Sequence, residues 1–337
     1  MTSKYVKPQK IAFFIVALLL LLLWARRPDV GEVPYSETSF LMDTLITITV
    51  SGVAEETAQR SVSEAFDKMR SVDEEMGRRD GTALDRLNKS GGGDLSQTMA
   101  AVIASAISWA EASGGAFDPT VAPLLDLWRV KDGPHPPPSG ENLSGAVEKT
   151  GYKALVLASD GKSIELNGRM LDLGGVAKGY AIDLAVKALK KAGVENFIVN
   201  AGGDLYVSGM KGERPWRVGI AHPRSPGELF AIVEPSDSAM VTSGDYERYF
   251  MWEEKRYHHI IDPKTGYPAG GVSSVTVTAR SAMDADALAT AVFILGEERG
   301  IAFLEGIDGA EGMVINASGD AMKSSGFNRA APEASNK

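Results

Sequence analysis

The chain has 337 residues, of which 44% are hydrophobic and 23% are charged, and this length is enough to bury a sizeable core. The first thirty residues carry five basic side chains and one acidic one, so the net charge of −9 becomes −13 on the rest of the chain, which argues against binding nucleic acid through the overall field. There is no cysteine, which excludes disulfides, thiolate catalysis, cysteine zinc sites and lipid attachment through an N-terminal cysteine.

The N-terminus is basic and then strongly apolar. Three lysines precede the apolar run Ile11–Ala25, and two arginines follow it. This run reaches the upper limit for the hydrophobic region of a signal peptide and is short for a membrane span, and no small-x-small cleavage site follows it. We predict an uncleaved anchor helix over residues 1–30 that holds the rest of the chain on the periplasmic side of the inner membrane. A cleaved signal peptide and a buried core helix are the alternatives.

The remaining chain is predicted to form a tether over residues 31–40, one folded domain over residues 41–325 and a tail over residues 326–337. In the first half of the domain, alternating apolar and polar residues indicate strands, and apolar residues on one helical face indicate helices. The expected elements are strand Thr44–Val50, helices Glu55–Glu75 and Thr98–Ala112, the proline-rich loop Asp132–Gly140, and strands Ala154–Leu157 and Ser163–Leu166.

The second half of the domain continues to interleave the two patterns. A helix is expected over Ala181–Lys191 with Asp183 and Lys187 on its outward face, and Gly193 is placed to end it. Interleaved helices and hairpin signals predict an α+β fold of mixed or antiparallel sheets with flanking helices. The other expected elements are strands Asn196–Asn200, Leu205–Gly209, Arg217–Ala221, Leu229–Val233, Tyr257–Ile261 and Val275–Ala279, and helix Asp284–Leu295.

The glycine-rich segment Leu171–Asp183, LDLGGVAKGYAID, resembles a phosphate-binding loop but matches neither common pattern. A Walker A loop needs GxxxxGK followed by Ser or Thr, and a dinucleotide fingerprint needs GxGxxG. Two glycines before a helix still allow close approach of the backbone to an anion, and Lys178 would add a positive charge. A tight turn with a surface lysine explains the spacing equally well.

The segment Ser281–Ala291, SAMDADALATA, carries a candidate metal pair. Asp286 and Thr290 are four residues apart, so on a helix they share one face, and this pair of oxygens suits a hard cation such as Mg²⁺. The more frequent explanation for such a pair is a solvated aspartate and a threonine bonded to its own helix. Asp284 faces elsewhere and is interpreted as a charge at the helix N-terminus.

Two further segments are candidates for catalysis and ring binding. His258 and His259 point to opposite faces of a strand, so only one can face a pocket and act as a base, although a structural histidine is the more common case. The segment Ser113–Trp128 has Gly-Gly, an aromatic residue and then Asp118-Pro-Thr120, which suits either a rigid loop beside a flat heteroaromatic ring or an ordinary core loop. Asp118 or Thr120 is expected to cap the short helix that follows.

Together these segments resemble one family. MDTLITI, GGAFDPTVAPLLDLW, LDLGGVAKGYAID, VNAGGDLYVSG, VTSGDYERYF, HHIIDPKTG and DADALATAVFILG occur in the order found in the ApbE family of FAD:protein FMN transferases, from about Phe40 to Leu295. The resemblance implies an ApbE-like fold and Mg²⁺-dependent transfer of FMN from FAD to a threonine or serine of an acceptor flavoprotein, through a phosphoester bond and with release of AMP. The alternatives are a Mg²⁺-dependent FAD pyrophosphatase and a non-catalytic, membrane-tethered flavin-binding protein.

The resemblance also implies roles for individual residues. His259 matches the histidine that assists proton removal from the acceptor hydroxyl. Asp286, Thr290 and the backbone carbonyl of Ala177 match the metal ligands. The residues that fall where the family holds FAD are Met42, Ala116, Phe117, Asp118, Gly174, Lys178, Tyr180 and Ile260.

The chain departs from the family pattern in two places. The family often has Met-Gly-Thr where this chain has Met42-Asp43-Thr44, and Arg78 and Arg79 stand where an aromatic residue commonly contacts the flavin. Arginine can stack on a ring or pair with phosphate, so flavin binding remains compatible with this sequence.

Overall fold

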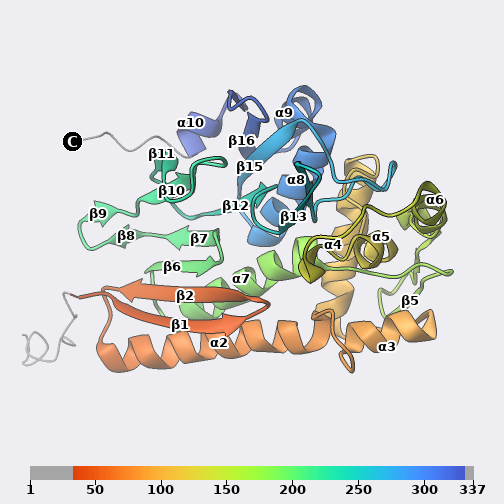
Figure 1. Cartoon of the computed structure of the whole chain (residues 1–337). Helices are drawn as coiled ribbons and strands as arrows, with labels where there is room; N and C mark the ends of the chain where they lie inside the picture. Colours follow the sequence, from red (N-terminus) through yellow and green to blue (C-terminus); the bar gives the residue numbers. More distant parts are fainter. Residues whose placement is uncertain (1–32, 331–337) are drawn as a thin grey trace, which may run out of the picture.

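The computed structural model describes residues 33–330 (Figure 1). The anchor expected over residues 1–30 lies outside this range. Among the helices of residues 33–330, none combines the length and the apolar character needed to span a bilayer.

A sheet of eight strands forms the centre of the molecule. Its order is β1-β2-β6-β7-β12-β15-β16-β17, and every neighbouring pair is antiparallel. The predicted α+β class with antiparallel pairing is therefore confirmed. The strands are β1 (Tyr35–Leu41), β2 (Thr44–Ser51), β6 (Asn196–Ala201), β7 (Asp204–Ser208), β12 (Ser238–Gly244), β15 (Val272–Ala279), β16 (Glu311–Asn316) and β17 (Ala321–Lys323).

Helices cover one face of this sheet and enclose the main core. Alternation in β2 turns Ile46, Ile48 and Val50 inward, where they join Val62 and Met69 of the helix that lies along the β1–β2 hairpin (Figure 1). The helices of this layer are α2 (Glu55–Met76), α4 (Gln97–Ala112), α7 (Gly174–Lys191), α8 (Ala282–Leu295) and α9 (Glu297–Glu305).

Two smaller cores lie outside this layer. One buries Val207, Trp216 and Phe327 with the hairpin of β10 (Val218–Ala221) and β11 (Leu229–Val233). The other stacks Trp128, Tyr257 and Phe250 between α5 (Ala122–Trp128), α6 (Gly140–Glu148) and the hairpin of β13 (Tyr249–Trp252) and β14 (Lys255–His258). The remaining elements are α3 (Ala83–Ser90), β3 (Gly92–Asp94), η1 (Val130–Asp132), η2 (Tyr152–Ala154), β4 (Val156–Leu157), β5 (Ser163–Glu165), β8 (Met210–Lys211), β9 (Arg214–Pro215) and α10 (Phe327–Ala330).

The structure corrects the predicted ends of the domain. Most of the expected tether, residues 31–40, belongs to edge strand β1, which pairs with β2 from Tyr35↔Val50 to Leu41↔Thr44. The expected tail, residues 326–337, begins inside the fold, because Phe327 is only 1% exposed in the second core. Only the second of these segments buries an apolar side chain against distant parts of the chain, and sequence periodicity does not reveal such a contact.

Candidate active site

The glycine-rich segment is the start of a helix. Helix α7 begins at Gly174, seven residues before the predicted start, and no strand precedes it. Three of its first four backbone donors are already bonded: Gly174 N–H donates to Asp172 Oδ1 at 2.8 Å, and the N–H groups of Val176 and Ala177 donate to the carbonyl of Leu173. The expected loop before the helix is therefore the first turn of the helix itself, and most of its N–H groups are already bonded within the protein.

Two glycines of α7 allow a close approach to α8. A Cβ atom at Gly179 would clash with the carbonyl oxygen of Ala282 and lie 2.6 Å from the Cα of Met283. A Cβ atom at Gly175 would lie 3.0 Å from the ring of Phe117 and 3.5 Å from Thr290 Oγ1. The glycines lower helix propensity, but they let the two helix backbones pack nearly in contact.

We predict that Gly179→Ala destabilises the protein although alanine is the better helix former. The gain in helix propensity is about 1 kcal/mol, whereas pushing backbone atoms apart in a packed core costs about 1–3 kcal/mol or more. Gly145→Ala in α6 is the matched control, because no atom lies within 4 Å of its added Cβ. Urea unfolding should show a lower stability for Gly179→Ala and an equal or higher stability for Gly145→Ala. Equal effects of the two changes would contradict the close contact.

The predicted metal pair faces this contact. Asp286 is 5% exposed, and its Oδ2 accepts a hydrogen bond of 3.1 Å from Gly179 N–H. Burial first, and then the charge of Asp204, raise the pKa of Asp286 to about 7. Thr290 lies one turn further along α8, beside the space that the missing side chain of Gly175 leaves. Asp286 and Thr290 are therefore on one face of α8, as predicted.

These residues fit a magnesium ion. The raised pKa of the buried Asp286 carboxylate indicates that a nearby positive charge would stabilise its ionised form. The Thr290 hydroxyl and the backbone carbonyl of Ala177, a buried residue of α7, would add two oxygen ligands. Within residues 33–330, no three His, Asp or Glu side chains cluster as a metal site. A short protein ligand set suits Mg²⁺, which usually keeps waters and phosphate oxygens as its other ligands.

Lys178 is paired with an aspartate that the sequence analysis did not single out. Asp204, 2% exposed at the start of β7, forms an ion pair with Lys178 and accepts the N–H of Thr242 at 3.1 Å. Desolvation lowers the pKa of Lys178, but the charges of Asp204 and Asp286 outweigh it and the net pKa is raised, so the ammonium stays charged. The sequence feature from which Asp204 could be predicted is its position directly after two glycines, Gly202 and Gly203, of the β6–β7 turn.

The two histidines have different partners, but the expected strand Tyr257–Ile261 is wrong in its bounds, because β14 ends at His258 and His259 follows it. His258 is buried, and both ring nitrogens are used: Nε2–H donates to the carbonyl of Ala269 and Nδ1 accepts the N–H of Ile260. His259 uses Nδ1–H toward the carbonyl of Arg248 at 3.3 Å, which leaves Nε2 as its unprotonated nitrogen. Desolvation first, and then the charge of Arg248, lower the pKa of His259 to about 3, so its imidazole is neutral at physiological pH.

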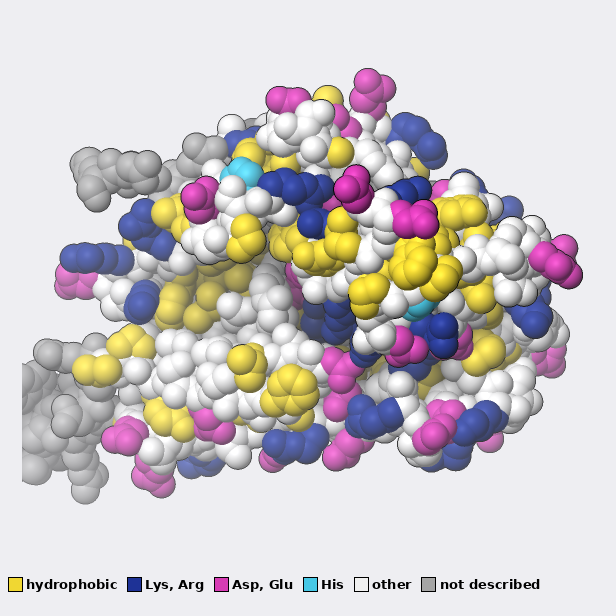
Figure 2. Space-filling model, viewed as in Figure 1, with side chains coloured by type: hydrophobic (Ala, Val, Ile, Leu, Met, Phe, Trp, Pro, Cys, Tyr) yellow, Lys and Arg dark blue, Asp and Glu magenta, His cyan; other side chains and the backbone are white. Residues whose placement is uncertain are grey.

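The charged groups around Lys178 lie close enough to influence one another. Lys178 and Asp204 affect the pKa of Asp286, and Lys178 also affects the pKa of His259. Glu247, at the end of the β12–β13 connection, belongs to the same group, since desolvation and then Asp204 raise its pKa to about 7. Figure 2 shows that the molecule is hollowed above the β1–β2 hairpin and that basic side chains gather there.

The loop Ala116–Asp118 is internally bonded. Asp118 Oδ1 accepts from the N–H and hydroxyl of Thr120 at 2.8 and 2.6 Å, and Oδ2 accepts the N–H of Tyr152 at 3.0 Å. Ala116 and Phe117 are buried. The expected capping of α5 by Asp118 or Thr120 is wrong, because α5 has Val121 at its N-cap and no side-chain cap. The predicted carboxylate contact with a ring would compete with bonds that hold the loop.

The departures from the family pattern have structural explanations. Met42 and Asp43 form the two-residue β1–β2 turn with φ angles of 53° and 60°, a conformation that glycine and aspartate tolerate well, and Asp43 pairs with Lys131. Arg78 is held by Asp126, by Asp172 at 3.3 Å and by the carbonyl of Ala122 at 3.3 Å, and Arg79 pairs with Asp73 at 2.8 Å. Both arginines therefore have partners within the protein.

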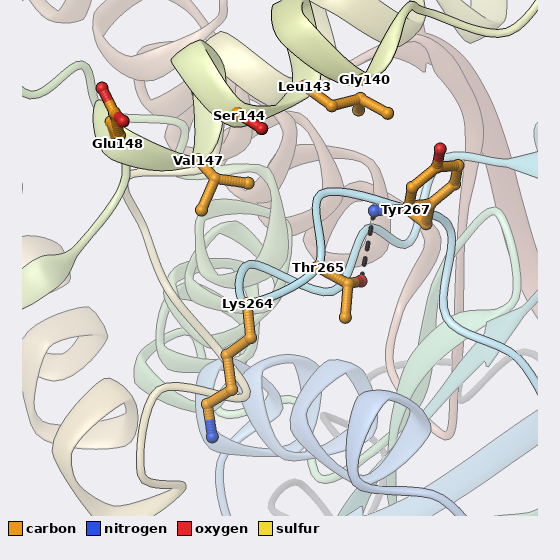
Figure 3. A pocket seen from close by; sticks show the side chains of 8 residues that line it. All are labelled: Gly140, Leu143, Ser144, Val147, Glu148, Lys264, Thr265 and Tyr267. Atoms are coloured by element: carbon orange, nitrogen blue, oxygen red, sulfur yellow. Dashed lines mark hydrogen bonds between the residues drawn. The ribbon is translucent and has the colours of Figure 1, made fainter.

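The other predicted FAD residues differ in exposure. Ile260 is 6% exposed and its carbonyl accepts the N–H of Ala269, whereas Tyr180 is only partly buried against the main core. A cavity of about 420 Å³ lies elsewhere, between α6 and the turn before Tyr267 (Figure 3). None of the predicted site residues lines it, so it is not the candidate site.

The fold is that of solved flavin transferases. The chain matches the ApbE protein from Thermotoga maritima with a TM-score of 0.81 and 32% identity, covering 88% of this chain and 99% of that chain. It matches the flavin transferase ApbE from Vibrio cholerae with a TM-score of 0.76 and 30% identity, again covering 88% and 99%.

The sequence comparison leads to the same group. The model of the ApbE family matches residues 42–314, and the chain belongs to this family. An FAD:protein FMN transferase from Vibrio cholerae is 38% identical over 209 residues, which are 60% of this chain and 63% of that protein. One from Treponema pallidum is 35% identical over 258 residues, 70% of this chain and 71% of that protein. The match thus spans less than two thirds of the Vibrio relative's length.

Proposed function

We propose that the protein transfers FMN from FAD to a threonine or serine hydroxyl of an acceptor flavoprotein, in a Mg²⁺-dependent reaction that forms a phosphoester and releases AMP. The packing of Asp286 and Thr290 against α7 supports this most. The ammonium of Lys178 is close enough to influence the pKa of both Asp286 and the neutral imidazole of His259. The relatives named FAD:protein FMN transferase support the transfer of FMN from FAD to a protein.

Each residue of the proposed site has a separate role in this reaction. The acceptor hydroxyl attacks the phosphorus of the FMN half, the bond to that phosphorus from the AMP half breaks, and AMP leaves with the electron pair. His259 Nε2 takes the hydroxyl proton. Lys178 holds positive charge beside the phosphates, and Asp204 keeps that ammonium in place. Mg²⁺, held by Asp286, Thr290 and the Ala177 carbonyl, would neutralise phosphate charge when bound.

A transfer assay tests this proposal. The purified protein is incubated with FAD, Mg²⁺ and an acceptor flavoprotein subunit, and the subunit is examined for flavin fluorescence in a denaturing gel. A labelled subunit together with AMP supports FMN transfer. Release of FMN and AMP without labelled subunit indicates a pyrophosphatase, and tight FAD binding without release of AMP indicates a flavin-binding protein; either result contradicts transfer.

We also propose that residues 1–30 anchor the protein in the inner membrane with the folded domain on the periplasmic side. The basic residues and the apolar run Ile11–Ala25 support this orientation. Protease added to spheroplasts should digest the domain while a cytoplasmic marker survives. Protection of the domain would contradict the orientation.

A further inference from the structure

Asp183, which the helical pattern assigned to the outward face of α7, contacts the start of α8. Its carboxylate accepts three hydrogen bonds: from Ser281 Oγ at 2.8 Å, from Ala282 N–H at 2.8 Å and from Met283 N–H at 3.0 Å. The prediction of an outward side chain is therefore wrong. The first donors of α8 have no partner inside their own helix, and an aspartate from another helix provides one.

Asp183 is the last of three contacts spaced one turn apart. Gly175 lies beside Thr290, Gly179 N–H donates to Asp286, and Asp183 bonds the backbone of Ala282. These positions are four residues apart on each helix, and their order is reversed between the helices, so α7 and α8 are antiparallel and meet along one stripe. Both side-chain ligands proposed for the metal belong to the α8 half of this stripe.

We propose that Asp183 is a positioning residue for the metal site: by bonding the first turn of α8 it fixes the rotation and register that direct Asp286 and Thr290 toward α7. This inference rests on the proposed function, because it assumes that these two side chains hold the metal. The glycines permit the close contact but do not select a register, since they offer no side chain. The three hydrogen bonds of Asp183 supply that selection.

Asp183→Asn tests this role with little change of shape. In either orientation of the amide, its NH₂ group faces a backbone N–H of α8, so at least one hydrogen bond is lost and two donors oppose each other. Loss of residues that orient metal ligands typically weakens metal binding about 10–100-fold. Mn²⁺ binding, followed by electron paramagnetic resonance with FAD present, should weaken about tenfold or more, and excess Mg²⁺ should restore most of the turnover.

Asp284→Asn is the matched control, because it makes the same change of a carboxylate to an amide within the turn of α8 that Asp183 bonds. The indole N–H of Trp109 donates to Asp284 Oδ1 at 2.9 Å, and an amide oxygen can accept that bond equally well. Its Mn²⁺ affinity should stay within about twofold of the original protein. Equal losses in the two variants would overturn the positioning role, because they would indicate a general loosening of the helix start.

Asp286→Ala separates this inference from the proposed function. If it binds Mn²⁺ as the original protein does, the metal assignment itself fails. If it loses Mn²⁺ while Asp183→Asn keeps full affinity, only the positioning role fails. Should Asp183→Asn not fold, Ser281→Asp replaces it, because a carboxylate at this N-cap can still accept the N–H of Asp284, whereas the hydrogen bond from Ser281 Oγ to Asp183 is lost and the two carboxylates repel each other. A dissociation constant raised about threefold or more then supports the role, and an unchanged one overturns it.

Discussion

Asp286→Asn is expected to abolish FMN transfer while leaving the metal-free protein as stable as before or more stable. Asparagine keeps the shape and can still accept the N–H of Gly179, but it removes the negative charge proposed to hold Mg²⁺. Metal ions supply several kcal/mol of charge stabilisation in such reactions, so the rate should fall at least about 100-fold. Asp284→Asn, two residues earlier on the same helix, should keep nearly full activity.

The effect on stability follows from the raised pKa of Asp286. Because the folded protein holds this proton up to a pKa of about 7 and the unfolded chain releases it near 4, the folded state binds more protons between these values. In EDTA, the original protein should therefore lose stability as pH rises from about 4 to 7, and Asp286→Asn should lose less. Full transfer activity of the variant at limiting Mg²⁺ would contradict the metal assignment.

His259→Ala is expected to slow transfer much more than His258→Ala does, by about 10²–10⁴-fold, the range for loss of a general base. His258→Ala should instead lower thermal stability, because it leaves the carbonyl of Ala269 and the N–H of Ile260 without their buried partner. Measuring turnover and melting temperature for both variants separates the two roles. The reverse order of rates would assign the base to the other histidine.

The lowered pKa of His259 also predicts a pH dependence. Since its imidazole stays neutral down to about pH 3, kcat/KM should show no loss of activity near pH 6.5 that depends on this residue. Its contribution to stability is present above pH 6.5 and is lost as pH falls toward 3, because the unfolded chain takes up the proton first. A histidine-dependent fall in kcat/KM between pH 7 and 6 would contradict the lowered pKa of His259.

Local patterns in the sequence predicted most strands and helices correctly. The alternation over Thr44–Val50 lies within β2, Leu229–Val233 coincides with β11, and the four-residue spacing of Asp286 and Thr290 placed them on one helix face. These features succeed because each depends on neighbours within a few residues.

The predictions that are wrong concern residues whose contacts lie in distant segments of the chain. Helix α7 begins earlier than predicted because Gly174, Gly175 and Gly179 disfavour a helix locally, and the contact with α8 explains two of them, Gly175 and Gly179. Asp183 was placed outward because its three partners lie about a hundred residues away. The role of Asp204 is not predicted from the sequence for the same reason, since its ion pair with Lys178 joins β7 to α7.

The hydrogen bond between Gly179 and Asp286 spans 107 positions of the chain. Between these two residues lie four strands of the central sheet, β6, β7, β12 and β15. Such non-local pairing folds slowly, because long loops must close before their contacts form. A chain emerging from the ribosome therefore contains the whole of α7 before α8 is synthesised, so the metal site proposed on these two helices can be completed only after both have been made.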